Sequence, residues 1–585
     1  MKNGYEKIQP LKHKNILLCV SGSIAAYKSV EVLSGLKKLG ANVAVVLSEE
    51  AKRFISPLSF EAISHTQVLH KDTESWVDFG KSLDFWDSNF CADLPANSCA
   101  DSIKTTCADS IADSHTDSLS DSSVSKSGFA DFAPPYPHPK SHIAYSKWAH
   151  IVLLVPATAN TIAKLAYGIA DNLIVQTLLA TNSKRTQILL APAMNTQMFL
   201  SPQVQSALDR LQDYDYEIIP PKEALLACDE YGVGALAEVK EIIFRTLRAS
   251  YMRDLPLRAK KSNKNSKQYD FSQSDFKQNN FGQSRFWQSG FWAGREVIIT
   301  GGGAISPIDT VRAISNHSSG KQAIALAKAA YTVGAKVTLI SSKIDSFLPS
   351  QIEFINAQSN DDYKEAIESK LRDFGDYVDC ENFGGFYDSA KSKNIKNKMP
   401  SKCKKPVLFM AAALCDYALQ SPKTYKIKKS TSPNLTLELQ SCEDVLASID
   451  SEKIYKVGFK AESVENITQK NEKNTLENTL EYALKNAKKM LRSVNEGGKG
   501  CSCVCLNAIS KNSTPFGAED NSFYLVDSRA LCDNQGDVCE HIAFLPPQSK
   551  LELSYQILDF VQSSLQGLGS AKNPLSAKSN TTKNK

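Results

Sequence analysis

A glycine-rich turn followed by a Ser-Ser-Gly-Lys run is the stretch of this sequence whose residue types best suit phosphate binding. Residues 297–303 read VIITGGG and residues 315–322 read SNHSSGKQ. An ATP-binding P-loop follows the pattern G-x-x-x-x-G-K-[ST], in which loop amides and the lysine hold the phosphates and the hydroxyl holds magnesium. Ser315 stands where the first glycine is required, and Gln322 follows Lys321, so the pattern fails at both ends. A nucleotide bound here would be held in another way.

Polar residues also follow the apolar runs of the first half. The segment SGSIAAYK (21–28) follows the run NILLCVS, Ser48 ends the next run, and PATANT (156–161) and APAMNT (191–196) end two more. Gly22 permits a close backbone approach, and the amides that begin the next helix offer an anion site. Ligands bind at the carboxyl ends of the strands in an open parallel sheet. A helix cap would explain any one of these residues, but the whole set indicates a binding site.

Two parallel sheets are needed to position these residues. Short apolar runs that alternate with helical patterns predict parallel strands covered by helices on both faces. The fold class is therefore α/β, with two Rossmann-like parallel-sheet domains. The predicted strands are 15–21, 43–48, 150–157, 186–193, 295–303, 335–342, 405–413, 456–461, 503–507 and 522–527, and the predicted helices include 24–39, 321–333 and 551–565.

Low-complexity segments interrupt this pattern and set the domain bounds. Residues 86–140 are rich in Ser, Asp and Ala, and their cysteines are eight apart, which does not suit a zinc site. We expect a disordered insertion there, with a partner-binding loop as the alternative. Residues 251–292 interleave polar residues with Phe and Trp. They predict a linker, with a single-stranded nucleic acid stacking surface as the alternative. The predicted domains are 14–250 and 293–568, the latter with an insertion at about 376–405, and a disordered tail covers 569–585.

Composition excludes several classes of function. The chain of 585 residues carries a net charge of +5, which is near balance and does not indicate bulk binding to nucleic acid or membranes. The N-terminus lacks a signal-peptide pattern, and no stretch is apolar over the roughly 18 residues that a membrane span needs. We therefore expect a cytoplasmic protein whose 14 cysteines are reduced.

The motifs of the first half resemble the homo-oligomeric flavin-containing cysteine decarboxylases, which are flavodoxin-like flavoproteins. They are SGSIAAYK, PATANTIAKLAYGIADNL, APAMNTQMF and LLACDEYGVGALAE. The resemblance implies that His142 is the active-site histidine, that Asn195 fixes the substrate carboxylate and amide, and that Cys228 protonates an enethiol intermediate from a flap. Gly234-Ala235 stands where the family has Gly-Arg. The FMN-binding residues implied are Gly22, Ser23, Ser48, Thr158, Ala159, Asn160 and Thr161.

The second half carries the motifs of a ligase. TGGGAISPIDTVRAISNHSSGKQ resembles the signature of phosphopantothenate–cysteine ligases, and AAALCDY (411–417) and KIKK (426–429) follow in the family's order. The whole chain thus resembles the bifunctional phosphopantothenoylcysteine decarboxylases/phosphopantothenate–cysteine ligases of coenzyme A biosynthesis. The resemblance covers about residues 14–70, 141–245 and 293–565.

This resemblance implies two reactions. In the ligase, the carboxylate of 4′-phosphopantothenate attacks CTP to give an acyl-cytidylate and pyrophosphate, and the amine of L-cysteine then displaces CMP. In the decarboxylase, FMN oxidises the CH₂–SH group of the product to a thioaldehyde, which accepts the electrons left when CO₂ departs. Magnesium is expected to bridge the phosphates of CTP, and the sequence assigns no protein ligands to it. The resemblance also implies a homo-oligomer.

The ligase residues are also assigned by motif. Asn316 handles the acyl-cytidylate by stabilising charge on the attacked carbonyl, Lys426 neutralises phosphate charge, Arg312 contacts the phosphopantothenate side, and Asp416 reads the cytosine edge. Two positions depart from the family: Lys460 replaces an alanine, and of two lysines expected four apart, Lys489 is present but Ser493 holds the second place. The substrate- and nucleotide-binding set is Gly301, Gly302, Arg312, Ser318, Ser319, Lys321, Ala412, Asp416, Lys428, Lys429, Phe459, Lys489 and Phe516.

Two alternatives stay open. The altered Gly234-Ala235 is compatible with a ligase whose first domain is a degenerate flavin-binding or oligomerisation module. A nucleic-acid-binding or scaffold protein built around the aromatic segment 251–292 is the other alternative.

Overall fold

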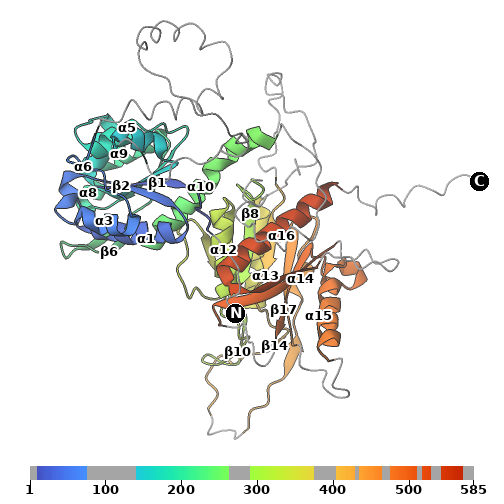
Figure 1. Ribbon diagram of the computed structural model, residues 1–585. Helices are drawn as coiled ribbons and strands as arrows, with labels where there is room; N and C mark the ends of the chain where they lie inside the picture. The colour runs from blue at the N-terminus through green and yellow to red at the C-terminus, as the bar shows by residue number, and fades with distance from the viewer. Residues whose placement is uncertain are drawn as a thin grey trace, which may run out of the picture. The chain divides into compact units, whose positions relative to one another are not determined.

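The computed structural model describes residues 9–75, 137, 140–262, 290–374, 404–428, 434–463, 475–509, 517–528 and 542–570. Most of the predicted insertion 86–140, much of the linker and of the insertion 376–405, and most of the tail lie outside these residues. The chain forms two compact units, one of residues 9–250 and one that contains the described residues from 251 onward (Figure 1). Helix α10 (Val239–Ser262) extends past this boundary into the segment predicted as a linker.

The first unit is built on a sheet of five parallel strands. The strand order is β2-β1-β3-β4-β5, which is the flavodoxin-like order 2-1-3-4-5. The order reverses between β1 and β3, so a crevice is expected at the carboxyl ends of these two strands. The strands are β1 (Asn15–Val20), β2 (Asn42–Leu47), β3 (Ile151–Ala157), β4 (Gln187–Pro192) and β5 (Tyr216–Ile218).

Helices cover both faces of this sheet, because successive strand residues point to opposite sides. Leu18 and Val20 of β1 pack with α1, α3 and α10, whereas Leu17 and Cys19 pack with α5, α6, α7 and α9. All four side chains are fully buried. The helices are α1 (Lys28–Lys38), α3 (Pro57–Ser64), α5 (His142–Trp148), α6 (Ala159–Tyr167), α7 (Leu173–Leu179) and α9 (Pro202–Asp213).

The second unit has an eight-stranded sheet in the order β12-β11-β8-β13-β16-β17-β18-β19. The first six strands are parallel and, numbered along the chain, follow the Rossmann order 3-2-1-4-5-6. The last two are antiparallel. The strands are β8 (Glu296–Gly301), β11 (Lys336–Ser341), β12 (Glu353–Asn356), β13 (Val407–Met410), β16 (Tyr455–Ser463), β17 (Cys503–Ile509), β18 (Asp520–Asp527) and β19 (Ile542–Ser549).

Helices also pack on this second sheet. α12 (Lys321–Thr332) and α16 (Lys550–Ser570) lie side by side (Figure 1). One core joins Ile298 and Val504 of the sheet to α13, α14 and α15, which are Asn360–Phe374, Val445–Ser448 and Thr475–Leu491. Two small antiparallel ribbons leave the carboxyl ends of β8 and β13, namely β9 with β10 (Ile305–Pro307, Ala313–Ser315) and β14 with β15 (Tyr417–Leu419, Leu439–Ser441). The predicted α/β class with two parallel sheets is confirmed.

Two candidate active sites

Hydrogen bonds of Ser21 join the carboxyl ends of β1 and β3. The Ser21 hydroxyl donates to the Pro156 carbonyl at 2.7 Å and accepts from the Thr158 amide at 3.1 Å. Gly22 follows at once, and a Cβ there would lie 2.3 Å from the Cβ of Glu50, so only glycine fits. The backbone at the carboxyl ends of β1 and β3 is therefore held in place where the strand order predicts a crevice.

The predicted flavin residues begin the helices that open at this edge. Ser23 caps the short 3-10 helix η1 (Ile24–Tyr27), Ser48 caps α2 (Glu49–Lys52), and Thr158 caps α6. Ala159 and Thr161 are buried in the first turn of α6, whereas Asn160 is exposed. The structure thus gathers all seven predicted residues at the carboxyl ends of β1, β2 and β3, although three hydroxyls already serve as caps.

Asn195 and Cys228 lie in contact on the same unit. The Asn195 Nδ2 is 3.3 Å from the Cys228 Sγ and donates to the Glu230 carboxylate at 3.1 Å. The Cys228 thiol is itself 3.7 Å from the same carboxylate. Motif reasoning assigned the first two residues and missed Glu230, whose only sequence signal was its place in the CDE triplet.

A hairpin carries Cys228 and is held against the Asn195 loop by glycines. It consists of β6 (Lys222–Leu225) and β7 (Tyr231–Ala235). The Met194 amide donates to the Gly234 carbonyl at 3.0 Å, and a Cβ on Gly234 would lie 2.3 Å from the Met194 carbonyl oxygen. Ala235, at the position of the family's arginine, pairs with Lys222 in the hairpin. Docking of the flap therefore does not require an arginine at 235.

His142 is the first residue of α5 and is paired with a carboxylate. Its Nδ1 lies 2.7 Å from Glu74 Oε1, and its backbone amide donates to the same oxygen at 3.2 Å. Only 16% of the His142 side chain and 18% of the Glu74 side chain are exposed. Sequence analysis missed Glu74, because the two residues are 68 positions apart and flank a low-complexity segment.

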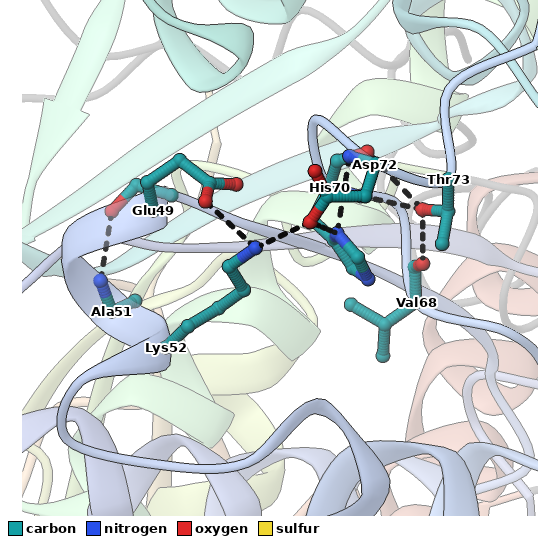
Figure 2. A network of polar contacts seen from close by, with 8 residues as sticks. Glu49, Ala51, Lys52, Val68, His70, Asp72 and Thr73 are labelled. Atoms are coloured by element: carbon teal, nitrogen blue, oxygen red, sulfur yellow. Dashed lines mark hydrogen bonds and ion pairs between the residues drawn. The ribbon is translucent and has the colours of Figure 1, made fainter.

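One group of possible metal ligands occurs among the described residues. Glu49, His70 and Asp72 place ligand atoms within 4.8 Å of one another. Figure 2 shows that Lys52 lies in their midst, with its ammonium 2.7 Å from Glu49 and 2.8 Å from Asp72. A cation of the chain itself thus bridges the two carboxylates, so the group is an ion-pair network.

The ligase motifs meet where the strand order of the second sheet reverses, between β8 and β13. Gly302 has a φ of 75°, and its carbonyl accepts from the Ala413 amide at 2.9 Å. The Asn316 Nδ2 donates to the carbonyls of Ala413 (3.0 Å) and Leu414 (2.8 Å). Both amide hydrogens of Asn316 are used, so the side chain has its oxygen left to interact with a substrate.

Arg312 and the KIKK segment are joined by a buried carboxylate. Asp309 accepts from the Arg312 guanidinium at 3.0 Å and from the backbone amides of Val311, Arg312 and Ile427. The Arg312 hydrogen bond, with these amides, holds the pKa of Asp309 far below its usual value. Arg312 also donates to the Ile427 carbonyl at 3.0 Å. The loop after β9 and the segment next to Lys426 are therefore tied together.

A cavity of about 760 Å³ opens at the carboxyl ends of β13 and β16. Phe459 forms one wall and meets Phe523 edge to face at 5.8 Å. Lys460, Lys499 and Lys550 also line the cavity and supply positive charge. The predicted residues that line it are Asn316, Ser318, Ser319, Ala412, Asp416 and Phe459.

Other predicted residues do not line this cavity. Lys321 instead donates to the Gly517 carbonyl at 3.0 Å and pairs with Glu519 at 2.5 Å. Lys499 and Lys550 were not predicted, because a lone lysine in an insertion or at a helix start carries no motif. Six more predicted residues are described but do not line the cavity: Gly301, Gly302, Arg312, Lys426, Lys428 and Lys489. Two others, Lys429 and Phe516, lie outside the described residues.

Two family models together span most of the chain. The Flavoprotein model matches residues 5–93 and 112–249, and the DNA/pantothenate metabolism flavoprotein C-terminal domain model matches residues 292–398 and 386–564. A coenzyme A biosynthesis bifunctional protein, CoaBC, of Bacillus subtilis is 28% identical over 94% of this chain and 96% of that protein. The CoaBC protein of Escherichia coli is 26% identical over 88% of this chain and 91% of its own length. The chain belongs to this family of bifunctional coenzyme A biosynthesis proteins.

The members of this family combine two enzymes, and the two units correspond to them. The flavoprotein unit is the decarboxylase half and the second unit is the ligase half. Solved structures similar to each half include a PPC decarboxylase (24% identity, TM-score 0.27, 40% of this chain and 97% of that chain) and the C-terminal domain of a CoaBC protein (21%, 0.31, 48% and 100%). No helix among the described residues is both long and apolar enough to cross a membrane.

Proposed function

We propose that the chain joins L-cysteine to 4′-phosphopantothenate at the expense of CTP, and then decarboxylates the product to 4′-phosphopantetheine with FMN. The observation that carries this proposal is the contact of Asn195 with Cys228 at 3.3 Å. It unites, from separate segments, the two residues that the family resemblance assigns to substrate binding and protonation. The reaction order follows from chemistry, because the decarboxylase substrate is the amide that the ligase makes.

The edge of the first sheet suits FMN in its donor set. The carboxyl ends of three strands are surrounded by polar groups. These are the hydroxyls of Ser23 and Ser48, the exposed amide of Asn160 and the first turn of α6. Such groups hydrogen-bond the phosphate and polyol of a nucleotide-like cofactor. FMN, when bound, supplies a hydride acceptor that makes the CH₂–SH carbon an electron sink for decarboxylation.

The chain's own residues then manage orientation and protons. Asn195 is oriented by Glu230 and offers its amide next to the thiol of Cys228. The Cys228 Sγ lies 3.7 Å from the Glu230 carboxylate, and a thiol at this place is the proton donor that we assign to the enethiol intermediate. Its exposed position on the β6–β7 hairpin lets it cover substrate after binding.

In the ligase half, the cavity suits a nucleoside triphosphate. Lys460, Lys499 and Lys550 offset phosphate charge, and Phe459 packs beside a base or ribose. We propose that the Asn316 oxygen accepts a hydrogen bond from the incoming cysteine amine, because its Nδ2 is occupied by two carbonyls. In this orientation the oxygen is an acceptor, whereas the charge-stabilising role expected from the sequence would use a donor.

Magnesium and the basic segment complete the proposal. Mg²⁺ is usually held by one or two carboxylates together with substrate phosphates, and Asp416 and Glu443 line the cavity. Lys426 is exposed and is tethered through Ile427 to Asp309, so it can approach a bound triphosphate. We also infer a homo-oligomer in the cytoplasm that binds neither nucleic acid nor membranes. Mass photometry tests the oligomeric state, and a nucleic-acid shift assay tests for nucleic-acid binding.

The deciding experiment follows 4′-phosphopantothenate, cysteine and CTP by mass spectrometry. We expect CMP, pyrophosphate, CO₂ and 4′-phosphopantetheine in equal amounts, from a yellow protein that releases FMN on denaturation. In Cys228→Ser, the enethiol formed after CO₂ loss should be trapped on the protein, and phosphopantothenoylcysteine should then accumulate because turnover stops. In Asn316→Ala, pyrophosphate release should continue at a higher rate than amide formation.

Two results would refute parts of this proposal. A colourless protein that ignores added FMN and releases no CO₂ would leave a ligase with a degenerate first unit. Failure of 4′-phosphopantothenate to stimulate pyrophosphate release from CTP would refute the ligase assignment.

A further inference from the structure

The His142–Glu74 pair fixes which ring nitrogen carries the hydrogen. A carboxylate accepts hydrogen bonds and does not donate them, so the 2.7 Å contact places a hydrogen on Nδ1. The same Glu74 oxygen also accepts from the His142 backbone amide at 3.2 Å. Two donors of one residue thus meet one oxygen, which restrains both the ring and the start of α5.

The turn that carries Glu74 is anchored on the sheet. The Glu74 amide donates to the His70 carbonyl at 3.1 Å, and the Thr73 hydroxyl donates to the Val68 carbonyl at 2.9 Å. Leu69, in the same turn, exchanges backbone hydrogen bonds with the edge strand β2. Figure 2 shows the polar network beside this turn, in which Lys52 of α2 bridges Glu49 and Asp72.

A second hydrogen bond closes the long excursion between the two partners. The Ser75 amide donates to the Lys140 carbonyl at 2.8 Å, so the chain leaves and returns at neighbouring points. Glu74 lies just before this closure and His142 just after it. The pairing therefore depends on the built turn and on the closure, and it does not arise from proximity in sequence.

We propose that Glu74 is a positioning residue for His142 in the decarboxylation, which rests on the function proposed above. With Nδ1 committed to Glu74, Nε2 is the nitrogen that exchanges a proton with substrate. It would accept the proton of the substrate thiol, and bound FMN would supply the hydride acceptor for the adjacent carbon, so two electrons and two hydrogens would leave the CH₂–SH group. The Glu74 carboxylate stabilises the imidazolium that results.

Variants at position 74 test this with two readouts. Glu74→Gln removes the charge at constant shape, and Glu74→Asp keeps a carboxylate. Glu61→Gln is the matched control, because Glu61 lies near the same turn and accepts from the Val68 amide. The first readout is the rate at which diethyl pyrocarbonate modifies His142, followed by peptide mass spectrometry, with exposed His65 as internal reference. The second is kcat and KM for CO₂ release.

We expect Glu74→Gln to slow modification of His142, because a hydrogen bond from Nδ1 to a carboxylate makes Nε2 more basic and a neutral amide does so less. Its kcat should fall on the order of 100-fold with little change in KM. Glu74→Asp should recover most of both effects, and Glu61→Gln should match the wild type. Unchanged His142 reactivity in Glu74→Gln would overturn the proposal.

Equal losses in all three variants would also overturn it, because they would indicate a structural role of the turn. Absence of CO₂ from the wild-type protein would refute the proposed function alone. The His142 modification rates would still decide whether Glu74 sets the histidine.

Discussion

Replacement of Gly302 by alanine tests the close packing at the ligase crevice. Gly302 and Gly497 share nearly the same left-handed φ, 75° and 73°. At Gly497 a Cβ would meet nothing within 4 Å, whereas at Gly302 it would lie 2.4 Å from the Ser342 Oγ and 3.3 Å from the Ser342 amide nitrogen. The two substitutions therefore share the backbone cost and differ in the steric one.

The expected magnitudes follow from this difference. A side chain in the left-handed region costs about 1–2 kcal/mol, which applies to both variants. Overpacking adds about 1–3 kcal/mol at Gly302 alone. Since the clash is with a hydroxyl, Ser342→Ala in the Gly302→Ala background should recover most of the added cost. Amide formation should also fall, because the Gly302 carbonyl holds Ala413 and Ala413 holds Asn316.

The assay is hydrogen exchange under increasing urea, read by mass spectrometry in peptides from β8 and β13. It measures the opening free energy of the second unit in the full chain. Gly302→Ala should lower it by more than Gly497→Ala. Equal losses within about 0.5 kcal/mol, the usual limit of additivity, would refute the steric argument. Failure of Ser342→Ala to recover stability would do the same.

Three further predictions concern charged residues. Asp309→Asn should destabilise the ligase half at neutral pH, and the difference should shrink below about pH 4, because a lowered folded pKa gives stability that is lost as pH falls. Asp559→Asn should stabilise at pH 8, since burial raises the pKa of Asp559 to about 7 and stability falls as pH rises from about 4 toward that value. Urea denaturation across pH measures both. Lys499→Met should raise the KM for CTP several-fold, whereas Lys489→Met should not, because only Lys499 lines the cavity.

The parallel sheets were predictable because each strand is a short apolar run, but the edge of the second sheet was not. Strand β19 contains Pro546 and Pro547, which argue against a strand in sequence. The structure places β19 last in the sheet, beside β18 alone. An edge strand tolerates residues that lack an N–H, so its position in the sheet explains its composition.

Motifs located Asn195, Cys228 and Asn316, but they could not give their partners. Glu74 and Glu230 are common residue types, and their importance comes from the folding of distant segments. The direction of the Asn316 amide was equally hidden, because it depends on two carbonyls about 97 residues away. Physical contact, which follows from topology, was the missing information.

The family resemblance predicts a lysine at position 493, but the chain has a serine there, which begins a short helix and a turn. Ser493 forms a capping box with Glu496 and starts a short 3-10 helix, η7 (Val494–Glu496). The Gly498 and Gly500 amides then bond back to the carbonyls of Ser493 and Arg492, which reverses the chain.

This reversal brings Lys499 to the cavity wall, 2.8 Å from Asp444. Lys489 stays exposed on α15 and is not among the lining residues. A glycine-rich turn thus places a lysine at the cavity wall in a chain that has serine at position 493. Ser493 thus begins the glycine-rich turn that carries Lys499 to the cavity wall.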